Sequence, residues 1–260
     1  MILGQLAQHA MDRVKEVKNT ASFDQLKTQA FSMAKGEERF LNIFKSGSLS
    51  FICELKKASP SKGLIDPKFD YLRIAREYEE AGADGISCLT EPRWFRGSDQ
   101  IFEDVRQQTK LPMLRKDFIV DEYQIFESKV MGADAILLIC AILDDAKLTY
   151  FIELASKLGL TALVEAHNEA EVKAAISCGA QIIGVNNRNL KDFTVDQHNA
   201  LKLRHLVPEN IFYIAESGIS NPVEVRALKE AGVHGLLIGE AMMRSENKVQ
   251  FLAQLRGEGK

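Results

Sequence analysis

The sequence has few cysteines, no strong excess of one charge and no long hydrophobic run. Its four cysteines, at positions 53, 88, 140 and 178, are far apart and none forms a CxxC pair. This spacing indicates reduced, mostly buried thiols in a cytoplasmic protein. The first 18 residues, MILGQLAQHAMDRVKEVK, carry charges at helical spacing and lack a long apolar core. We therefore expect neither a signal peptide nor a membrane span here.

The charge balance excludes some classes of partner. The formal net charge of the 260 residues is -3 at pH 7. A value so close to neutral gives no reason to expect nucleic acid or an anionic membrane as a partner, so any anion site must be built locally. Hydrophobic residues make up 46% of the chain and charged residues 27%, which is typical of a globular protein with a large core. The length fits two average domains or one α/β barrel.

The first part of the chain differs from the rest. Apolar residues at helical spacing predict two amphipathic helices, near Ile2–Val17 and Phe23–Ala34. We expect residues 1–45 to form a helical N-terminal extension and residues 46–260 to form the main domain. The sequence leaves open whether the extension closes one end of that domain or helps to hold a substrate.

Short apolar runs then alternate with helical patterns through eight β/α units. Strands are expected near residues 51–56, 85–89, 113–116, 135–139, 162–165, 182–186, 212–215 and 235–238. Helices are expected near 71–81, 99–108, 122–131, 145–158, 169–177, 197–203 and 222–231, with a last one near the C-terminus. Short connections, and the lack of a GxGxxG after the first strand, favour one closed (β/α)8 barrel over an open dinucleotide-binding sheet.

Polar residues stand at the C-terminal ends of these strands, where each apolar run stops. In a parallel barrel these ends all face one mouth, which is where barrel active sites lie. A single charged residue there would be an ordinary strand end, but their joint placement predicts a functional site. The residues are Glu54, Lys56, Ser87, Lys116, Glu165, Asn186, Arg188, Glu216 and Ser217.

The types of these residues suggest proton transfer. Lys116 and Glu165 form a candidate acid and base pair, because a crowded cationic mouth lowers the pKa of a lysine and burial raises that of a glutamate. Glu54 and Lys56 share one face of the first strand and add a second pair. A metal site is less favoured, because no histidine lies among the strand-end residues and His167 resembles a loop residue. A Schiff-base lysine stays open.

Two glycine-containing loops predict a phosphate site. The seventh strand ends in AESGISNP and the eighth in LIGEAMM. Gly218 and Gly239 permit close backbone approach to an oxyanion, and a helix beginning at Glu240 would direct free N–H groups at it. Loops after strands seven and eight are the usual phosphate position in this fold. A carboxylate facing a phosphate is unfavourable, so only the backbone N–H of Glu240 is expected to contribute.

Seven segments resemble the indole-3-glycerol phosphate synthase family: ELKKASPSKG, SCLTE, LRKDFIVD, LVEAHN, GVNNRNL, IAESGI and LIGEAMM. The resemblance covers all eight units and nearly the whole chain. It implies a (β/α)8 lyase of tryptophan biosynthesis with no metal or organic cofactor. The implied reaction converts 1-(2-carboxyphenylamino)-1-deoxyribulose 5-phosphate into indole-3-glycerol phosphate, carbon dioxide and water.

The resemblance also implies a role for each strand-end residue. Lys116 would be the general acid at the substrate ketone, Glu165 would serve in the dehydration, and Glu54 would assist proton transfer. Lys56 would bind the carboxylate that is lost. The other expected substrate-binding residues are Ser59, Ser87, Phe95, Phe118, Asn186, Arg188, Glu216 and Ser217, with Phe95 and Phe118 as walls for the aromatic ring. The expected phosphate-binding positions are Ser59, Gly218, Gly239 and Glu240.

Two alternatives differ in their chemistry. A barrel like phosphoribosylanthranilate isomerase would share the phosphate loops, but the combination of Glu54 and Lys56 with Lys116 and Glu165 argues against it. A non-catalytic barrel that binds a phosphorylated ligand is the other alternative, and the intact acid and base residues argue against that. The sequence leaves open an association with other enzymes of the tryptophan pathway.

Overall fold

A computed structural model describes residues 2–189 and 193–258. Within these ranges eight parallel strands close into a barrel in the order β1-β10-β9-β8-β7-β6-β5-β4. They are β1 (Ser50–Leu55), β4 (Gly85–Leu89), β5 (Met113–Lys116), β6 (Ala135–Ile139), β7 (Thr161–Ala166), β8 (Ile182–Asn186), β9 (Phe212–Glu216) and β10 (Gly235–Ile238). The first strand pairs with both β4 and β10, which closes the ring. The predicted (β/α)8 barrel is confirmed, and every barrel strand begins and ends within one residue of its expected range.

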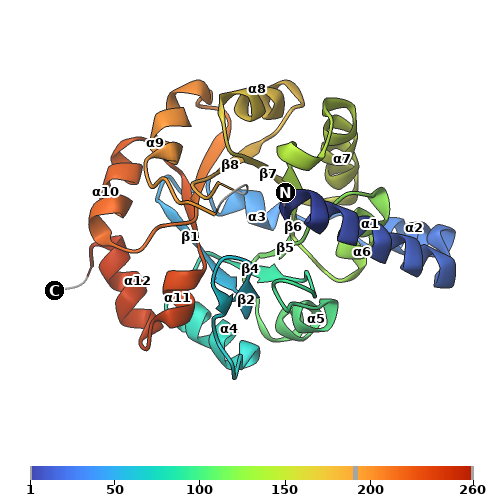
Figure 1. The fold of residues 1–260 in the computed structure, drawn as a ribbon, viewed down its shortest axis with the longest axis horizontal. Coiled ribbons are helices and arrows are strands. Elements are labelled where there is room, and N and C mark those ends of the chain that lie inside the picture. The colour runs from blue at the N-terminus through green and yellow to red at the C-terminus, as the bar shows by residue number, and fades with distance from the viewer. Residues whose placement is uncertain (1, 190–192, 259–260) are drawn as a thin grey trace.

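Helices surround the strands as an outer ring (Figure 1). They are α4 (Tyr71–Glu80), α5 (Asp99–Gln108), α6 (Glu122–Val130), α7 (Asp145–Leu158), α8 (Glu169–Ser177), α9 (Asn199–Leu203), α10 (Pro222–Glu230) and α12 (Lys248–Arg256). Side-chain caps set where all of these helices except α9 begin. At α10, for example, Asn221 and Glu224 form a capping box and Pro222 occupies the first turn. Shorter helical segments are η1 (Cys140–Ile142), η2 (Arg204–Leu206) and α11 (Glu240–Arg244).

The apolar core has two layers, because alternate residues of each strand point inward and outward. Ile52, Leu114 and Leu163 fill the inside of the barrel. Phe51 and Val164, their neighbours in sequence, pack between the strands and the helices. Each such buried aliphatic or aromatic side chain contributes about 1.5–3 kcal/mol, so the barrel gives a rigid frame for the strand ends.

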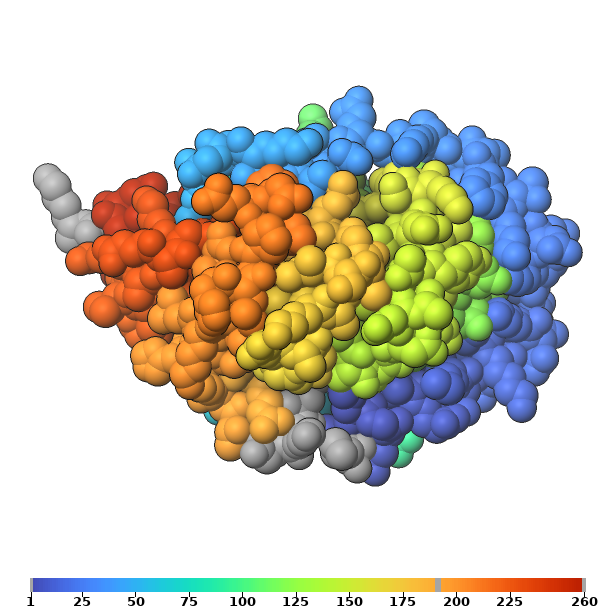
Figure 2. All heavy atoms as spheres, turned by 90° about the horizontal axis from the view of Figure 1, so that it is seen from above, coloured from blue at the N-terminus to red at the C-terminus, as the bar shows by residue number. Residues whose placement is uncertain are grey.

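Three helices precede the barrel: α1 (Ile2–Thr20), α2 (Phe23–Ser32) and α3 (Arg39–Asn42). The N-terminal segment, blue in Figure 2, runs along one side of the molecule, from one end of the barrel to the other. Phe40 of α3 is fully buried with the barrel interior, Phe23 of α2 packs on Phe126 of α6, and Leu6 of α1 reaches the cavity described below. The extension thus contacts both the closed end of the barrel and its mouth. Its boundary at residues 45 and 46 stays a prediction.

A few elements differ from expectation. The loop after β1 contains a two-stranded hairpin, β2 (Ala58–Ser59) and β3 (Gly63–Leu64), which is too short to show a period of two in the sequence. The helix expected from residue 197 begins at Asn199. Over the part of the chain that the structure describes, no helix has the length and apolarity needed to cross a membrane.

Candidate active site

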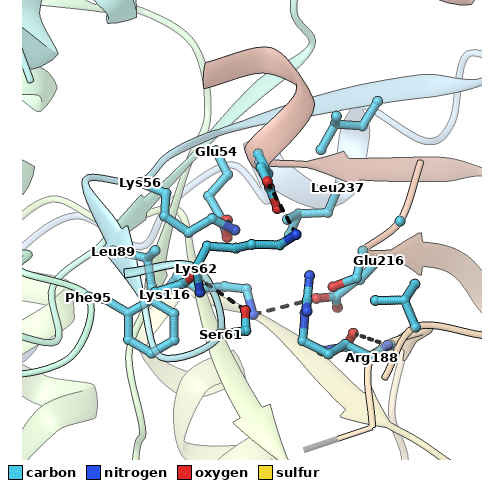
Figure 3. A pocket seen from close by; sticks show the side chains of 18 of the residues that line it. Glu54, Lys56, Ser61, Lys62, Leu89, Phe95, Lys116, Arg188, Glu216 and Leu237 are labelled. Carbon is cyan, nitrogen blue, oxygen red and sulfur yellow. Dashed lines mark hydrogen bonds and ion pairs between the residues drawn. The ribbon is translucent and has the colours of Figure 1, made fainter. Parts of the chain in front are cut away.

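A cavity of about 840 Å³ opens at the C-terminal ends of the strands. Figure 3 shows Glu54, Lys56, Lys116 and Glu216 converging on it, with Phe95 and Arg188 on opposite sides. The topology therefore brings together side chains from distant parts of the sequence. The predicted site residues that line the cavity are Glu54, Lys56, Ser59, Phe95, Lys116, Phe118, Glu165, Asn186, Arg188, Glu216, Ser217, Gly218, Gly239 and Glu240.

Ser87 is the predicted site residue that does not line the cavity. It is fully buried, and its hydroxyl has no hydrogen-bond partner among the described residues. Leu89, two residues later on the same face of β4, lines the cavity instead. Ser87 therefore lies one layer deeper than the cavity floor, a placement that does not support the expected direct contact with substrate.

Lys116 is surrounded by carboxylates. Its Nζ lies 3.1 Å from Oε2 of Glu165 and 3.4 Å from Oε2 of Glu216. Burial opposes the charge of Lys116, but Glu165, Glu216 and Glu54 outweigh it and raise the pKa of the lysine. The expected lowering of this pKa is wrong, because the surroundings of Lys116 are acidic rather than cationic. Lys116 rests as an ammonium ion.

The two buried glutamates beside Lys116 have opposite pKa shifts. Burial alone would raise the pKa of Glu165, but Lys116 and His167 outweigh it and hold that pKa well below its usual range. The expected rise at Glu165 is therefore wrong. Burial, together with the charges of Glu165 and Glu54, raises the pKa of Glu216 to about 7 even though Lys116 opposes the shift. Glu216 is thus the carboxyl group of this cluster that takes a proton near neutral pH.

Glu54 and Lys56 form a second, smaller ion pair. Nζ of Lys56 donates to Oε1 of Glu54 at 2.5 Å, and the carboxylate of Glu54 is almost fully buried. The pair lies against Gly239, where a Cβ atom would collide with Oε1 of Glu54 and stand 2.6 Å from Nζ of Lys56. Gly239 therefore makes room for this pair and is also the N-cap of α11, which begins at Glu240 as predicted.

His167, expected to be a loop residue, lies beside the carboxylate cluster. It follows β7 directly, and its Nε2 is 3.2 Å from Oε1 of Glu165. Asn168 begins α8 as its N-cap, so the Asn-x-x-Glu spacing to Glu171 was the local signal that could have placed this histidine. No group of three or more His, Cys, Asp or Glu side chains within residues 2–189 and 193–258 is arranged to hold a metal ion.

An aromatic wall forms one side of the cavity. The rings of Phe95 and Phe118 lie 6.2 Å apart at an angle of 40°. Glu91, which the sequence analysis missed, holds this wall in place, since its buried carboxylate accepts from the backbone N–H groups of Arg93, Trp94 and Phe95. The wall is apolar and preformed, which suits an aromatic ring.

The loop after β9 has an unusual backbone. Ser217 and Gly218 have φ angles of 67° and 77°, a conformation that a non-glycine residue such as Ser217 rarely adopts. The side-chain amide of Asn187 donates to the carbonyl oxygen of Ser217 at 3.0 Å. Arg188 donates from Nη1 to the carbonyl oxygen of Phe193 at 3.2 Å. The Asn187 bond links the loops after β8 and β9, and the Arg188 bond is made within the loop after β8.

Charged residues also border the opposite side of the mouth. Oε1 of Glu240 accepts from Nε of Arg244 at 3.0 Å and lies 3.8 Å from Nζ of Lys62, which is in the β2–β3 hairpin. The Glu240 carboxylate is thereby partly neutralised. Lys62 and Arg244 are cationic lining residues that the sequence analysis did not identify.

The N-terminal extension is attached to the barrel at the residue next to Lys116. Arg13 of α1 makes a bidentate ion pair with Asp117, the residue after Lys116, at 2.6 and 3.2 Å. Asp117 is buried and also accepts from the hydroxyl of Thr90 at 2.6 Å. The backbone that carries Lys116 is therefore held between α1 and Thr90, the residue that follows β4.

Solved structures of other proteins share the fold. A thiamine phosphate pyrophosphorylase from Pyrococcus furiosus superposes with a TM-score of 0.61 at 19% identity, over 84% of this chain and 96% of its own. A 3-hexulose-6-phosphate synthase superposes with a TM-score of 0.63 at 12% identity, over 82% of this chain and 100% of its own. At these identities the likeness concerns the barrel alone.

Sequence comparison is more specific. The chain is 50% identical to an indole-3-glycerol phosphate synthase of Ruminiclostridium cellulolyticum, over 99% of both chains. It is 45% identical to one of Lachnoclostridium phytofermentans, over 98% of this chain and 99% of that relative. The family model for indole-3-glycerol phosphate synthase matches residues 3–255. The chain therefore belongs to the indole-3-glycerol phosphate synthase family.

Proposed function

We infer that the chain converts 1-(2-carboxyphenylamino)-1-deoxyribulose 5-phosphate into indole-3-glycerol phosphate, carbon dioxide and water. The observation that carries this function is the position of the Lys116 ammonium group. It lies in the cavity between two carboxylates, 3.1 and 3.4 Å away, with an aromatic wall on one side and the glycine loops on the other. A proton donor at a ketone, a slot for an aryl ring and an anion site are what the ring closure requires.

Lys116 acts on the substrate ketone in this proposal. As the aromatic carbon attacks, negative charge develops on the ketone oxygen, and a preformed ammonium group stabilises and protonates it. The surrounding carboxylates keep Lys116 charged before the substrate arrives. Loss of carbon dioxide then restores the aromaticity of the ring.

The remaining charged residues divide between dehydration and binding. Glu165, ionised and buried, accepts a proton in the dehydration, and Glu54 assists proton transfer. Lys56 binds the carboxylate that is lost. Asn186 and Arg188 orient the hydroxyl groups of the substrate, and Glu216 and Ser217 line the site.

The aryl and phosphate ends of the substrate lie on opposite sides of this machinery. Phe95 and Phe118 enclose the ring. The phosphate is bound by Ser59 and the backbone at Gly218, Gly239 and Glu240. The hydrogen bond from Arg244 to the Glu240 side chain supports this assignment. It engages the carboxylate of Glu240, so this carboxylate does not compete with a phosphate for the backbone N–H.

The test is purified protein mixed with the substrate in EDTA, followed by the fluorescence of the indole product and the release of carbon dioxide. We expect both signals from the wild type and a rate lower by orders of magnitude for Glu165→Gln, the scale of a lost acid or base. A loss of less than about threefold would count against the role of Glu165. Ligand binding without product would indicate a non-catalytic barrel, and turnover without carbon dioxide would indicate an isomerase.

Two further expectations belong to this proposal. A cytoplasmic location is supported by the four unpaired cysteines, three of which are buried. An association with other enzymes of tryptophan biosynthesis stays a prediction.

A further inference from the structure

His167 makes two contacts with carboxylates that the proposed mechanism does not use. Its Nε2 lies 3.2 Å from Oε1 of Glu165, an ion pair rather than an aligned hydrogen bond, and its Nδ1 lies 3.0 Å from Oε2 of Glu171 on α8. The backbone N–H of His167 donates to the same Glu171 oxygen at 2.8 Å, and the side-chain amide of Asn168 donates to the other at 2.7 Å. The ring is therefore held in one orientation, with 13% of its side chain exposed.

This geometry favours the doubly protonated form of the ring. A neutral imidazole carries one N–H, so one of its two nitrogens would direct a lone pair at a carboxylate oxygen. An imidazolium carries a proton on both nitrogens, so it directs no lone pair at either carboxylate and its positive charge attracts both. Burial opposes the charge, but the contacts with Glu165 and Glu171 outweigh it and raise the pKa of His167 to about 10. His167 is therefore cationic at neutral pH.

The two oxygens of Glu165 consequently face two different cations. Oε1 faces His167 and Oε2 faces Lys116, so the carboxylate is fixed from both sides. The charges of Glu165 and Glu171 also act on the Cys140 thiol. This thiol stays neutral because burial and the charge of Glu171 raise its pKa to about 12. The other charged groups that act on this arrangement are Glu216 on β9 and Glu54 on β1.

We propose that His167 is a positioning residue, which acts as an imidazolium anchored by Glu171 to keep Glu165 ionised and correctly oriented for proton transfer. His167 does not line the cavity, so it acts through Glu165 rather than on the substrate. The proposal rests on the role of Glu165 given above. Without the imidazolium, burial raises the pKa of Glu165 with Lys116 alone left to oppose it, so the protonated form, which cannot accept a proton, is populated more readily as the pH falls.

The test compares the kcat/KM of His167→Gln with that of the wild type from pH 8 to pH 5. We expect the variant-to-wild-type ratio to fall about threefold to tenfold as the pH is lowered, because glutamine offers a donor but no charge. Titration of the substrate phosphate affects both proteins equally and cancels in the ratio. His205→Gln is the matched control, since His205 lies in η2 and does not line the cavity, and its ratio should stay flat. A flat ratio for His167→Gln would overturn the proposal.

A double variant separates positioning from a general structural effect. If His167 acts through Glu165, the Glu165→Gln/His167→Gln variant should be no slower than Glu165→Gln, whereas multiplied losses would contradict the proposal. If His167→Gln does not fold, Glu171→Gln replaces it and should move the ratio in the same direction. Wild-type turnover by Glu165→Gln would overturn the role of Glu165 itself. A loss in Glu165→Gln with a flat ratio for His167→Gln overturns the positioning role alone.

Discussion

Oε2 of Glu216 lies 3.4 Å from Nζ of Lys116, while Oε1 of the same carboxylate is buried with no hydrogen-bond partner among the described residues and lies where a side chain on Gly184 would be. A glutamate in this position is costly to ionise, since one oxygen has only an ion pair and the other has no partner in the part of the chain that the structure describes. Glycine at position 184 is what makes room for it. The arrangement favours binding chemistry over stability at this point of the barrel.

Glu216→Gln should stabilise the protein while slowing it. The folded state binds the Glu216 proton more tightly than the unfolded chain, so this group favours folding at low pH and loses that contribution as the pH rises through about 7. Glutamine resembles the protonated form at every pH. We expect the variant to gain on the order of 2–3 kcal/mol in unfolding free energy above pH 7, and little below about pH 4.5.

Urea unfolding at pH 4, 6 and 8 checks this prediction, with product formation measured in parallel. Equal stability of the two proteins at pH 8 would contradict the burial argument for Glu216. Wild-type turnover by the variant would contradict its place in the substrate site.

Gly239→Ala should damage the site more than the fold. The added Cβ would displace Glu54 and Lys56, whose atoms occupy the space beside Gly239. We expect kcat/KM to fall at least about tenfold, because moving charged groups by about 1 Å from their reactive positions lowers the rate by this factor or more. Gly4→Ala is the matched control, since a Cβ at Gly4 meets nothing within 4 Å and should leave turnover unchanged. Activity within twofold of the wild type for Gly239→Ala would show that the pair does not need its position.

Arg13→Gln should weaken the attachment of the extension at Lys116. It removes a bidentate partner from the buried carboxylate of Asp117, a loss of about 1–3 kcal/mol in unfolding free energy. Lys18→Gln is the control on the same helix, because the ion pair of Lys18 with Asp121 is about one-third exposed on each side and is worth about 0–1 kcal/mol. Chemical denaturation compares the two variants. Equal losses would indicate that burial of Asp117 does not strengthen its pairing.

The barrel could be predicted because each strand and each helix has its own hydrophobic period in the sequence. The ends of β1, β4, β5, β7, β8, β9 and β10 could be placed at one mouth because the C-terminal ends of parallel strands lie on the same side of a barrel. The electrostatics could not be predicted in this way. The surroundings of Lys116 depend on Glu54, Glu165 and Glu216, which come from three other strands, and only their distances show that the lysine is held in an acidic rather than a cationic environment.

The positions of Ser87 and His167 could not be predicted from the ends of the strands. Ser87 is expected at the mouth, but β4 extends two residues beyond it to Leu89, so the serine lies one layer deeper than the cavity. The prediction that His167 is a loop residue does not reveal its place beside the site, because its contact with Glu165 depends on the anchor that Glu171 provides from the next helix. A sequence period gives the face of a strand, but not how far along the barrel axis a side chain lies.

The most direct test of the central claim is product formation by Lys116→Met. Removing the ammonium group also leaves Glu165 and Glu216 without their shared cation, so we expect a loss of about 3–5 kcal/mol in stability. The Lys116→Met/Glu216→Gln variant should recover part of that loss and serves as the folded control. Indole fluorescence should show near loss of turnover in both variants while substrate binding persists. Wild-type-like turnover in either would contradict the assignment of Lys116 as the general acid.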